Sequence, residues 1–150
     1  MEIREVSIKD KNIMNEIVEM EKDTFGKFGG VDLWILKPIV KFGKVFVAIE
    51  DEKVVGAAEF MIAFDRPEVF LYGFSVMKEY REKGIGTTLL LYCEEYFKNY
   101  NKEVISLTVD PKNIKAINLY QRIDYFIESL EKDEYDIGID RFIMKKFLTS

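Results

Sequence analysis

The chain has 150 residues, of which 48% are hydrophobic and 33% charged, and its net charge is −5. This balance is typical of a globular protein, so we expect one domain over residues 1–150, and the acidic excess argues against general nucleic-acid binding. There is no histidine and a single cysteine, Cys93, which excludes histidine-dependent triads, histidine-ligated metal centres and an intrachain disulfide.

The chain begins with charged residues rather than an apolar run, so its start does not resemble a secretory signal. No later stretch has the length of a membrane span. We therefore expect a cytoplasmic monomer or homodimer that uses no metal and binds neither membrane nor nucleic acid.

The first part of the chain predicts one strand and two helices. Apolar residues alternate over Ile3–Ile8, as in a strand, and then recur at helical spacing over residues 11–22. Three glycines mark a loop from Phe25 to Gly30. An apolar segment over residues 31–40 predicts a second short helix that ends near Pro38.

The middle of the chain predicts three consecutive antiparallel strands. Residues 44–49 and 53–62 are rich in β-branched and aromatic residues, and the polar turn at 50–52 joins them as a hairpin. A third strand is expected over residues 69–77.

The last part alternates helices and strands. We expect a helix over residues 85–98, a strand over 104–109, a helix from Asn113 to Tyr120, and extended structure from Phe126 that ends in a strand over 141–148. A strand–helix–strand unit implies one parallel pairing. The expected fold is α/β, with a mixed, mostly antiparallel sheet flanked by helices.

The junction between the third strand and the helix at residue 85 carries a candidate anion site. Helix N-termini present unpaired N–H groups, and Gly84 and Gly86 let a ligand approach the backbone closely. Arg81 and Lys83 add positive charge. The glycines could also serve only the tight turn. A third small residue, as in a dinucleotide-binding fingerprint, is missing because Leu89 stands there.

Two motifs in register resemble those of the GNAT N-acetyltransferase family. Arg81-x-x-Gly84-x-Gly86 resembles the family's acetyl-CoA-binding motif, and residues 113–120 are similar to its second motif, Asn-x-x-Ala-x-x-Leu-Tyr. The resemblance implies the GNAT fold and direct transfer of acetyl from acetyl-CoA to a primary amine. The acceptor could be a protein N-terminus or a small polyamine. The alternative is a non-catalytic CoA-binding sensor or partner protein.

The resemblance also implies roles for individual residues. Tyr120 would protonate the departing thiolate, and Asn113 would contact pantetheine. Backbone groups of the third strand would pair with pantetheine, those of the loop would hold the pyrophosphate, and a basic side chain would lie near the CoA phosphates: Phe74 and Val76; Arg81, Glu82, Lys83, Gly84, Ile85, Gly86 and Thr87; and Arg122.

Several of these residues have a simpler structural interpretation. Asn113 could only cap its helix, and Tyr120 could be ordinary core. Asp124 stands where the family usually has a glycine, and aspartate tolerates the left-handed conformation that this position requires.

Two further residues are candidates for handling the acceptor. Glu59 lies in an apolar strand on which the family often places a general base, and it could equally face solvent. Tyr135 lies in a segment, 133–141, that resembles the acceptor-site loop of the family's protein N-terminal acetyltransferases.

Overall fold

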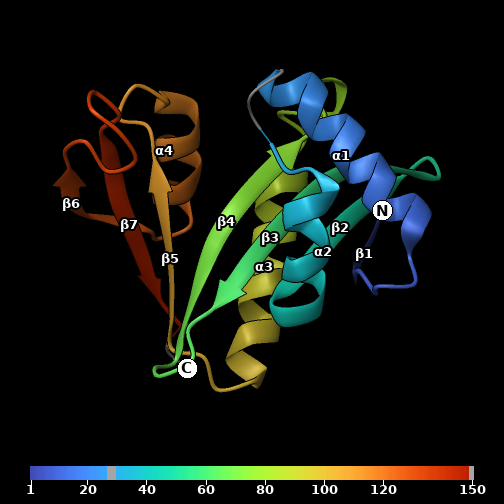
Figure 1. The fold of residues 1–150 in the computed structure, drawn as a ribbon, viewed down its shortest axis with the longest axis horizontal. Coiled ribbons are helices and arrows are strands. Elements are labelled where there is room, and N and C mark those ends of the chain that lie inside the picture. Colours follow the sequence, from blue (N-terminus) through green and yellow to red (C-terminus); the bar gives the residue numbers. More distant parts are fainter. Residues whose placement is uncertain (27–29, 149–150) are drawn as a thin grey trace.

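The computed structural model describes residues 1–26 and 30–148, which form one sheet of seven strands with four α-helices (Figure 1). The strands are β1 (Glu2–Glu5), β2 (Lys44–Glu50), β3 (Lys53–Ile62), β4 (Glu68–Val76), β5 (Val104–Val109), β6 (Phe126–Glu131) and β7 (Arg141–Phe147). The helices are α1 (Lys11–Phe25), α2 (Leu33–Phe42), α3 (Ile85–Asn99) and α4 (Ile114–Arg122). The predicted loop from Phe25 to Gly30 includes residues 27–29, which lie outside the described residues, and Phe25 itself ends α1.

Both faces of the sheet are covered by helices. Helices α1 and α2 pack on one face through buried residues such as Ile17 and Leu36. Helix α3 packs on the other face through Leu89 and Phe97, and α4 joins the same cluster through Ile117. The alternation of buried side chains along β2 and β3 feeds both clusters, which is why these strands are apolar almost throughout. The predicted α/β fold with flanking helices is confirmed.

The strand order is β1-β2-β3-β4-β5-β7-β6. Neighbours from β1 to β4 are antiparallel, and β4 and β5 form the one parallel pair among the described strands, as predicted. This pair is short, because the ladder joins Glu68–Phe70 only to Val104–Ser106. Beyond it the two strands diverge, which opens the sheet near its middle (Figure 1).

Several predicted boundaries are wrong by a few residues, and two of them have a clear physical reason. Strand β1 ends at Glu5 rather than Ile8, because the Asp10 carboxylate accepts the Ser7 N–H at 2.8 Å and folds the chain into a turn. Ile8 is consequently 40% exposed. Helix α2 continues past Pro38 to Phe42. Pro38 lies on the exposed side of α2, where water can satisfy the carbonyl that loses its partner, while Ile39 anchors the opposite side.

The expectation for Asp124 is confirmed. It follows α4 with φ of 74°, in the left-handed region that aspartate tolerates better than most residues. The departure from the family motif at this position therefore leaves the turn into β6 intact.

Within residues 1–26 and 30–148, no helix combines the length and the apolar character needed to cross a membrane.

Candidate active site

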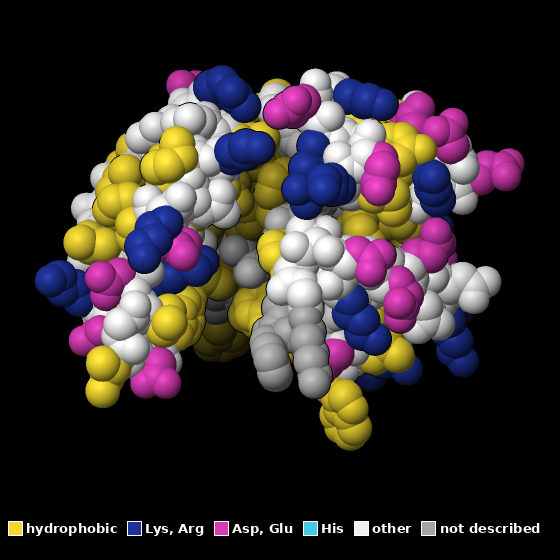
Figure 2. Space-filling view, turned by 90° about the horizontal axis from the view of Figure 1, so that it is seen from above, with side chains coloured by type: hydrophobic (Ala, Val, Ile, Leu, Met, Phe, Trp, Pro, Cys, Tyr) yellow, Lys and Arg dark blue, Asp and Glu magenta, His cyan; other side chains and the backbone are white. Residues whose placement is uncertain are grey.

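A cavity of about 610 Å³ occupies the opening between β4 and β5. Its walls come from both strands, from α1 and α4, and from the segment between β6 and β7. Figure 2 looks down on the hollowed end of the molecule, where hydrophobic side chains line the hollow and Lys and Arg side chains gather along one rim. The site therefore exists because the parallel ladder stops early.

The exposed edge of β4 offers free backbone groups to a ligand in this cavity. The N–H of Met77 donates to Val55 on β3 at 2.7 Å. Because backbone groups alternate in direction along a strand, those of Val76 and Phe74 point the other way, toward the opening. The carbonyl of Val76 already accepts the Arg81 Nε at 2.9 Å. The N–H of Val76 and both backbone groups of Phe74 lie beyond the β4–β5 ladder and, among the described residues, remain for a ligand.

The loop before α3 forms an anion cradle. The N–H groups from Glu82 to Thr87 have no hydrogen-bond partner among the residues that the structure describes. Gly84 takes φ of 80° as the N-cap of α3, a conformation that glycine adopts at no steric cost. A Cβ on Gly86 would lie 3.0 Å from Phe74 Cζ and 3.4 Å from Val76 Cγ2. The loop thus has the free N–H donors that a pyrophosphate group would need. Gly84 serves the turn, and Gly86 allows α3 to pack closely against β4.

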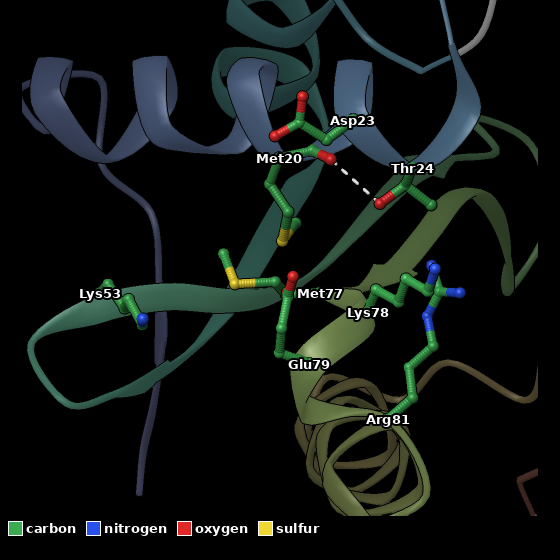
Figure 3. A pocket seen from close by; sticks show the side chains of 8 residues that line it. All are labelled: Met20, Asp23, Thr24, Lys53, Met77, Lys78, Glu79 and Arg81. Atoms are coloured by element: carbon green, nitrogen blue, oxygen red, sulfur yellow. Dashed lines mark hydrogen bonds between the residues drawn. The ribbon is translucent and has the colours of Figure 1, made fainter.

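The cationic side chains near this loop are spread over three surfaces. The side chain of Arg81 lines a second cavity of about 830 Å³, between the end of α1 and the end of β4 (Figure 3). Lys83 Nζ lies 5.3 Å from the centre of the Tyr80 ring. Arg122 is exposed in the last turn of α4. Lys83 and Arg122 are thus accessible from solvent, whereas the Arg81 side chain is hydrogen-bonded to the backbone of β4.

Asn113 and Tyr120 both line the cavity from α4. Asn113 Oδ1 accepts the Ala116 N–H at 3.2 Å, so the residue caps α4 and still has its Nδ2 donor. The Tyr120 ring lies between Phe74 and Tyr125, at centroid distances of 6.2 and 5.7 Å. The Tyr120 hydroxyl has no hydrogen bond to any described residue, and burial raises the pKa of Tyr120 well above its ordinary value.

Tyr135 and Arg141 form the wall opposite α1. The Tyr135 hydroxyl lies 3.1 Å from Thr108 Oγ1, and its ring stacks 5.8 Å from the Arg141 guanidinium. Arg141 Nη2 also donates to the Thr108 carbonyl at 3.0 Å. These contacts hold a 62% exposed tyrosine at the mouth of the cavity, so the structure brings the predicted Tyr135 into the same site as Tyr120.

Glu59 lies behind the cavity rather than in it. It is 0% exposed on β3, so the expectation that it could face solvent is wrong. Opposite it, the β3–β4 register passes from Glu59↔Gly73 to Phe60↔Leu71, which leaves Tyr72 as a bulge. A Cβ on Gly73 would lie 3.3 Å from the carboxyl atoms of Glu59. Glycine at this position therefore makes room for the buried carboxyl beneath the cavity wall.

Glu21 is the residue that the sequence analysis missed. It lies on α1, lines the cavity and is only 1% exposed. In the amphipathic pattern Glu21 lies on the apolar side of the helix with Ile17 and Val18. A carboxyl at such a position could have been recognised from the sequence as a candidate site residue. A carboxyl on the buried face of a helix needs a partner or a function.

Comparison with known proteins identifies the family of the chain. A model of the acetyltransferase (GNAT) family matches residues 14–125. An N-alpha-acetyltransferase of Saccharolobus solfataricus is 34% identical over 112 residues, 67% of this chain and 67% of that protein. An uncharacterized N-acetyltransferase of Methanocaldococcus jannaschii is 32% identical over 148 residues, 97% of this chain and 91% of its own length.

The fold is shared with solved structures. Ard1 from Thermoplasma volcanium superposes with a TM-score of 0.86 at 18% identity, covering 99% of this chain and 98% of that one. Family match and relatives favour catalysis over a CoA-binding module without activity. The chain therefore belongs to the GNAT family of acetyltransferases and is an N-acetyltransferase that uses acetyl-CoA.

Proposed function

We propose that this enzyme acetylates the α-amino group of a protein or peptide N-terminus. The observation that carries this proposal is the polarity of the cavity: the carboxyl of Glu21 lies at one wall, and Tyr135 and Arg141 lie at another. A peptide presents an α-ammonium to the carboxyl and, a few atoms away, carbonyl oxygens that accept from hydroxyl and guanidinium donors. A polyamine has a second ammonium instead, which Arg141 would repel.

The relatives support the same acceptor class. The Saccharolobus solfataricus relative and a Sulfurisphaera tokodaii relative, 35% identical over 71 residues, both carry the name N-alpha-acetyltransferase. The second candidate acceptor, a small polyamine, has only the acidic net charge of the chain in its favour.

The proposed roles of the residues follow from their positions. Backbone groups of Phe74 and Val76 would bind pantetheine, and the N–H groups from Glu82 to Thr87, with Lys83 and Arg122 nearby, would bind the phosphates. The Arg81 N–H, expected to join them, already donates to the Lys78 carbonyl at 3.3 Å. Bound acetyl-CoA supplies a thioester whose acyl carbon the amine attacks. Tyr120 donates its proton to the departing sulfur. Glu59 would take part in deprotonating the amine from its position behind the cavity wall, which it can do only through another group because it does not line the cavity.

The acceptor class can be tested with three amines at equal concentration. The first is a peptide with an internal lysine and a free N-terminus, the second is the same peptide with its N-terminus formylated, and the third is spermidine. Thiol released from acetyl-CoA is the readout. We expect release with the free peptide, none above background with the formylated one, and a kcat/KM for spermidine at least about tenfold lower, since one unfavourable charge contact is worth roughly 1.4 kcal/mol. Faster turnover of spermidine would overturn the proposed acceptor.

A second prediction concerns Asn113. Asn113→Asp keeps the oxygen that caps α4 but replaces the Nδ2 donor by a negative charge, so we expect an unchanged melting temperature and a KM for acetyl-CoA raised about tenfold. Asn113→Ala removes the cap as well and should cost roughly 1 kcal/mol of stability. An unchanged KM in both variants would leave Asn113 with the cap alone.

A further inference from the structure

Two buried carboxyl groups meet beneath the acceptor side of the cavity. Glu59 comes from β3 and Glu21 from α1, with exposures of 0% and 1%. Both oxygens of Glu59 and Oε2 of Glu21 lack a hydrogen-bond donor within residues 1–26 and 30–148, while Glu21 Oε1 accepts the Val31 N–H at 3.2 Å. Each of the two carboxyl groups therefore has the other as its main polar neighbour.

Within the part of the chain that the structure describes, no cationic side chain is paired with either carboxyl. Of the other titratable groups, Tyr72 on β4 lies close enough to both carboxyls for their charges to raise its pKa, and Arg141 lines the same cavity as Glu21 without a salt bridge to it. Two ionised carboxylates in such a place would be strongly destabilising, so the pair retains a proton.

Burial, a hydrogen bond to Glu21 and the charge of Glu21 raise the pKa of Glu59 well above its ordinary value. Burial also raises the pKa of Glu21, and its hydrogen bonds with Glu59 and Val31 oppose that rise. Glu21 accepts the Val31 N–H, whereas Glu59 has no donor among the described residues, so the arrangement favours a protonated Glu59 that shares its proton with an ionised Glu21.

On the basis of the proposed function, we infer that Glu21 and Glu59 act as a one-proton pair in which Glu59 donates to Glu21 and Glu21 receives the proton of the acceptor's α-ammonium. Glu21 lines the cavity and Glu59 does not, so an acceptor bound in the cavity would reach the pair through Glu21. Glu59 positions the Glu21 carboxylate and adjusts its basicity.

The proton balance of the step is simple. The ammonium R–NH₃⁺ transfers one proton to the Glu21 carboxylate, and the resulting lone pair of R–NH₂ attacks the thioester carbon. The C–N bond forms as the C–S bond breaks, Tyr120 gives its proton to the sulfur, and the second proton of the amine restores Tyr120. The proton on Glu21 leaves to solvent after product release, which returns the pair to one proton.

This arrangement suits a base for amines. The pair carries one net negative charge in a place where water is excluded, so it attracts an ammonium strongly. A carboxylate with an ordinary pKa is too weak a base for an ammonium, and raising its pKa toward the operating pH improves the transfer. The buried partner is what makes Glu21 basic enough.

The first test needs no acceptor. Infrared absorption of protonated carboxyl groups is recorded against pH for the wild type, Glu59→Gln, Glu21→Gln and the control Glu16→Gln, an exposed residue on α1 that accepts the Val54 N–H at 3.3 Å. We expect a protonated carboxyl at neutral pH in the wild type, in Glu21→Gln and in the control, and none in Glu59→Gln. In Glu21→Gln it should ionise at lower pH than in the wild type, because the neighbouring charge is gone.

Absence of a protonated carboxyl in the wild type, or an identical ionisation in Glu21→Gln, would overturn the pair. Thermal stability gives an independent readout. Unfolded Glu59 ionises near its ordinary pKa of 4.5, while the folded form keeps its proton to higher pH. The wild type should therefore lose stability as pH rises above that value, and Glu59→Gln should lose less.

Single-turnover rates with the free peptide then test the catalytic role. Glu21→Gln should fall about 10²-fold at neutral pH and recover as pH approaches the pKa of the α-amine, with unchanged acetyl-CoA affinity. Glu59→Gln should move the pH profile of the rate, which a purely structural residue would not do. Flat profiles in both variants refute the pair, whereas failure of every peptide with the infrared signal intact refutes only the proposed acceptor.

Discussion

Replacing Tyr120 by phenylalanine should lower the single-turnover rate of acetyl transfer by about 10²-fold, a typical contribution of a general acid. The affinity for acetyl-CoA should barely change, because the ring and its packing against Phe74 and Tyr125 are kept. Burial raises the pKa of the Tyr120 hydroxyl, so the group is protonated at neutral pH and can donate to a thiolate. Rapid-quench measurement of the acetylated peptide is the readout, since product release does not enter it.

Tyr125→Phe is the matched control. Its ring lies 5.7 Å from that of Tyr120, but its hydroxyl donates to Glu94 Oε2 at 3.1 Å and does not reach the cavity. The control should lower the melting temperature, because it leaves a buried acceptor short of a donor, and it should keep the wild-type rate. Equal rates in the wild type and Tyr120→Phe would mean that Tyr120 is packing and that the sulfur takes its proton from water.

Gly86→Val should abolish the stabilisation of the protein by acetyl-CoA. In the wild type, ligand at 100 times its Kd should add about 2.7 kcal/mol, which raises the melting temperature by roughly 5–10 °C for a chain of this size. The first carbon of a valine side chain would lie 3.0 Å from Phe74 Cζ, and the branches would push that ring into the cavity that it lines. Both the strand edge and the first turn of α3 would then be blocked.

Thr88→Val provides a comparison in the same turn of α3. It keeps the size of the side chain and removes a hydroxyl that donates to the Gly84 carbonyl at 2.9 Å on the exposed side of the helix. This variant should retain the acetyl-CoA shift. A full shift in a folded Gly86→Val protein would show that the cofactor does not lie along this loop.

The sequence predicted most of the elements because each has a strong local signal. The periods of the strands and helices, the polar turn at 50–52 and the glycine pair before α3 all depend on residues close together in the chain. The wrong boundaries arise from contacts that local patterns do not contain. Asp10 turned back to bind the Ser7 N–H, and α2 tolerated Pro38 because its unpaired carbonyl lies on the solvent side.

The candidate site divides in the same way. The cofactor loop and α4 are contiguous motifs, so their residues could be named from the sequence. The partnership of Glu21 with Glu59 joins two elements 38 residues apart in the numbering and depends on a bulge at Tyr72 and on the absence of a side chain at Gly73. Such pairings depend on the register between neighbouring strands and on how deeply each side chain is buried. The periodicity of the sequence specifies neither.

The short ladder between β4 and β5 has a consequence for the cooperativity of the molecule. The C-terminal segment from β5 onward is joined to the rest through that ladder, through packing on α3, and through the Glu94 carboxylate, which Lys146 Nζ contacts at 2.6 Å. Segments joined by so few main-chain bonds open as separate units, at less than the full free energy of unfolding. A ligand that bonds to both diverging strands bridges the two units, so saturation should merge their local openings into a single global transition and slow amide exchange far from the cavity itself.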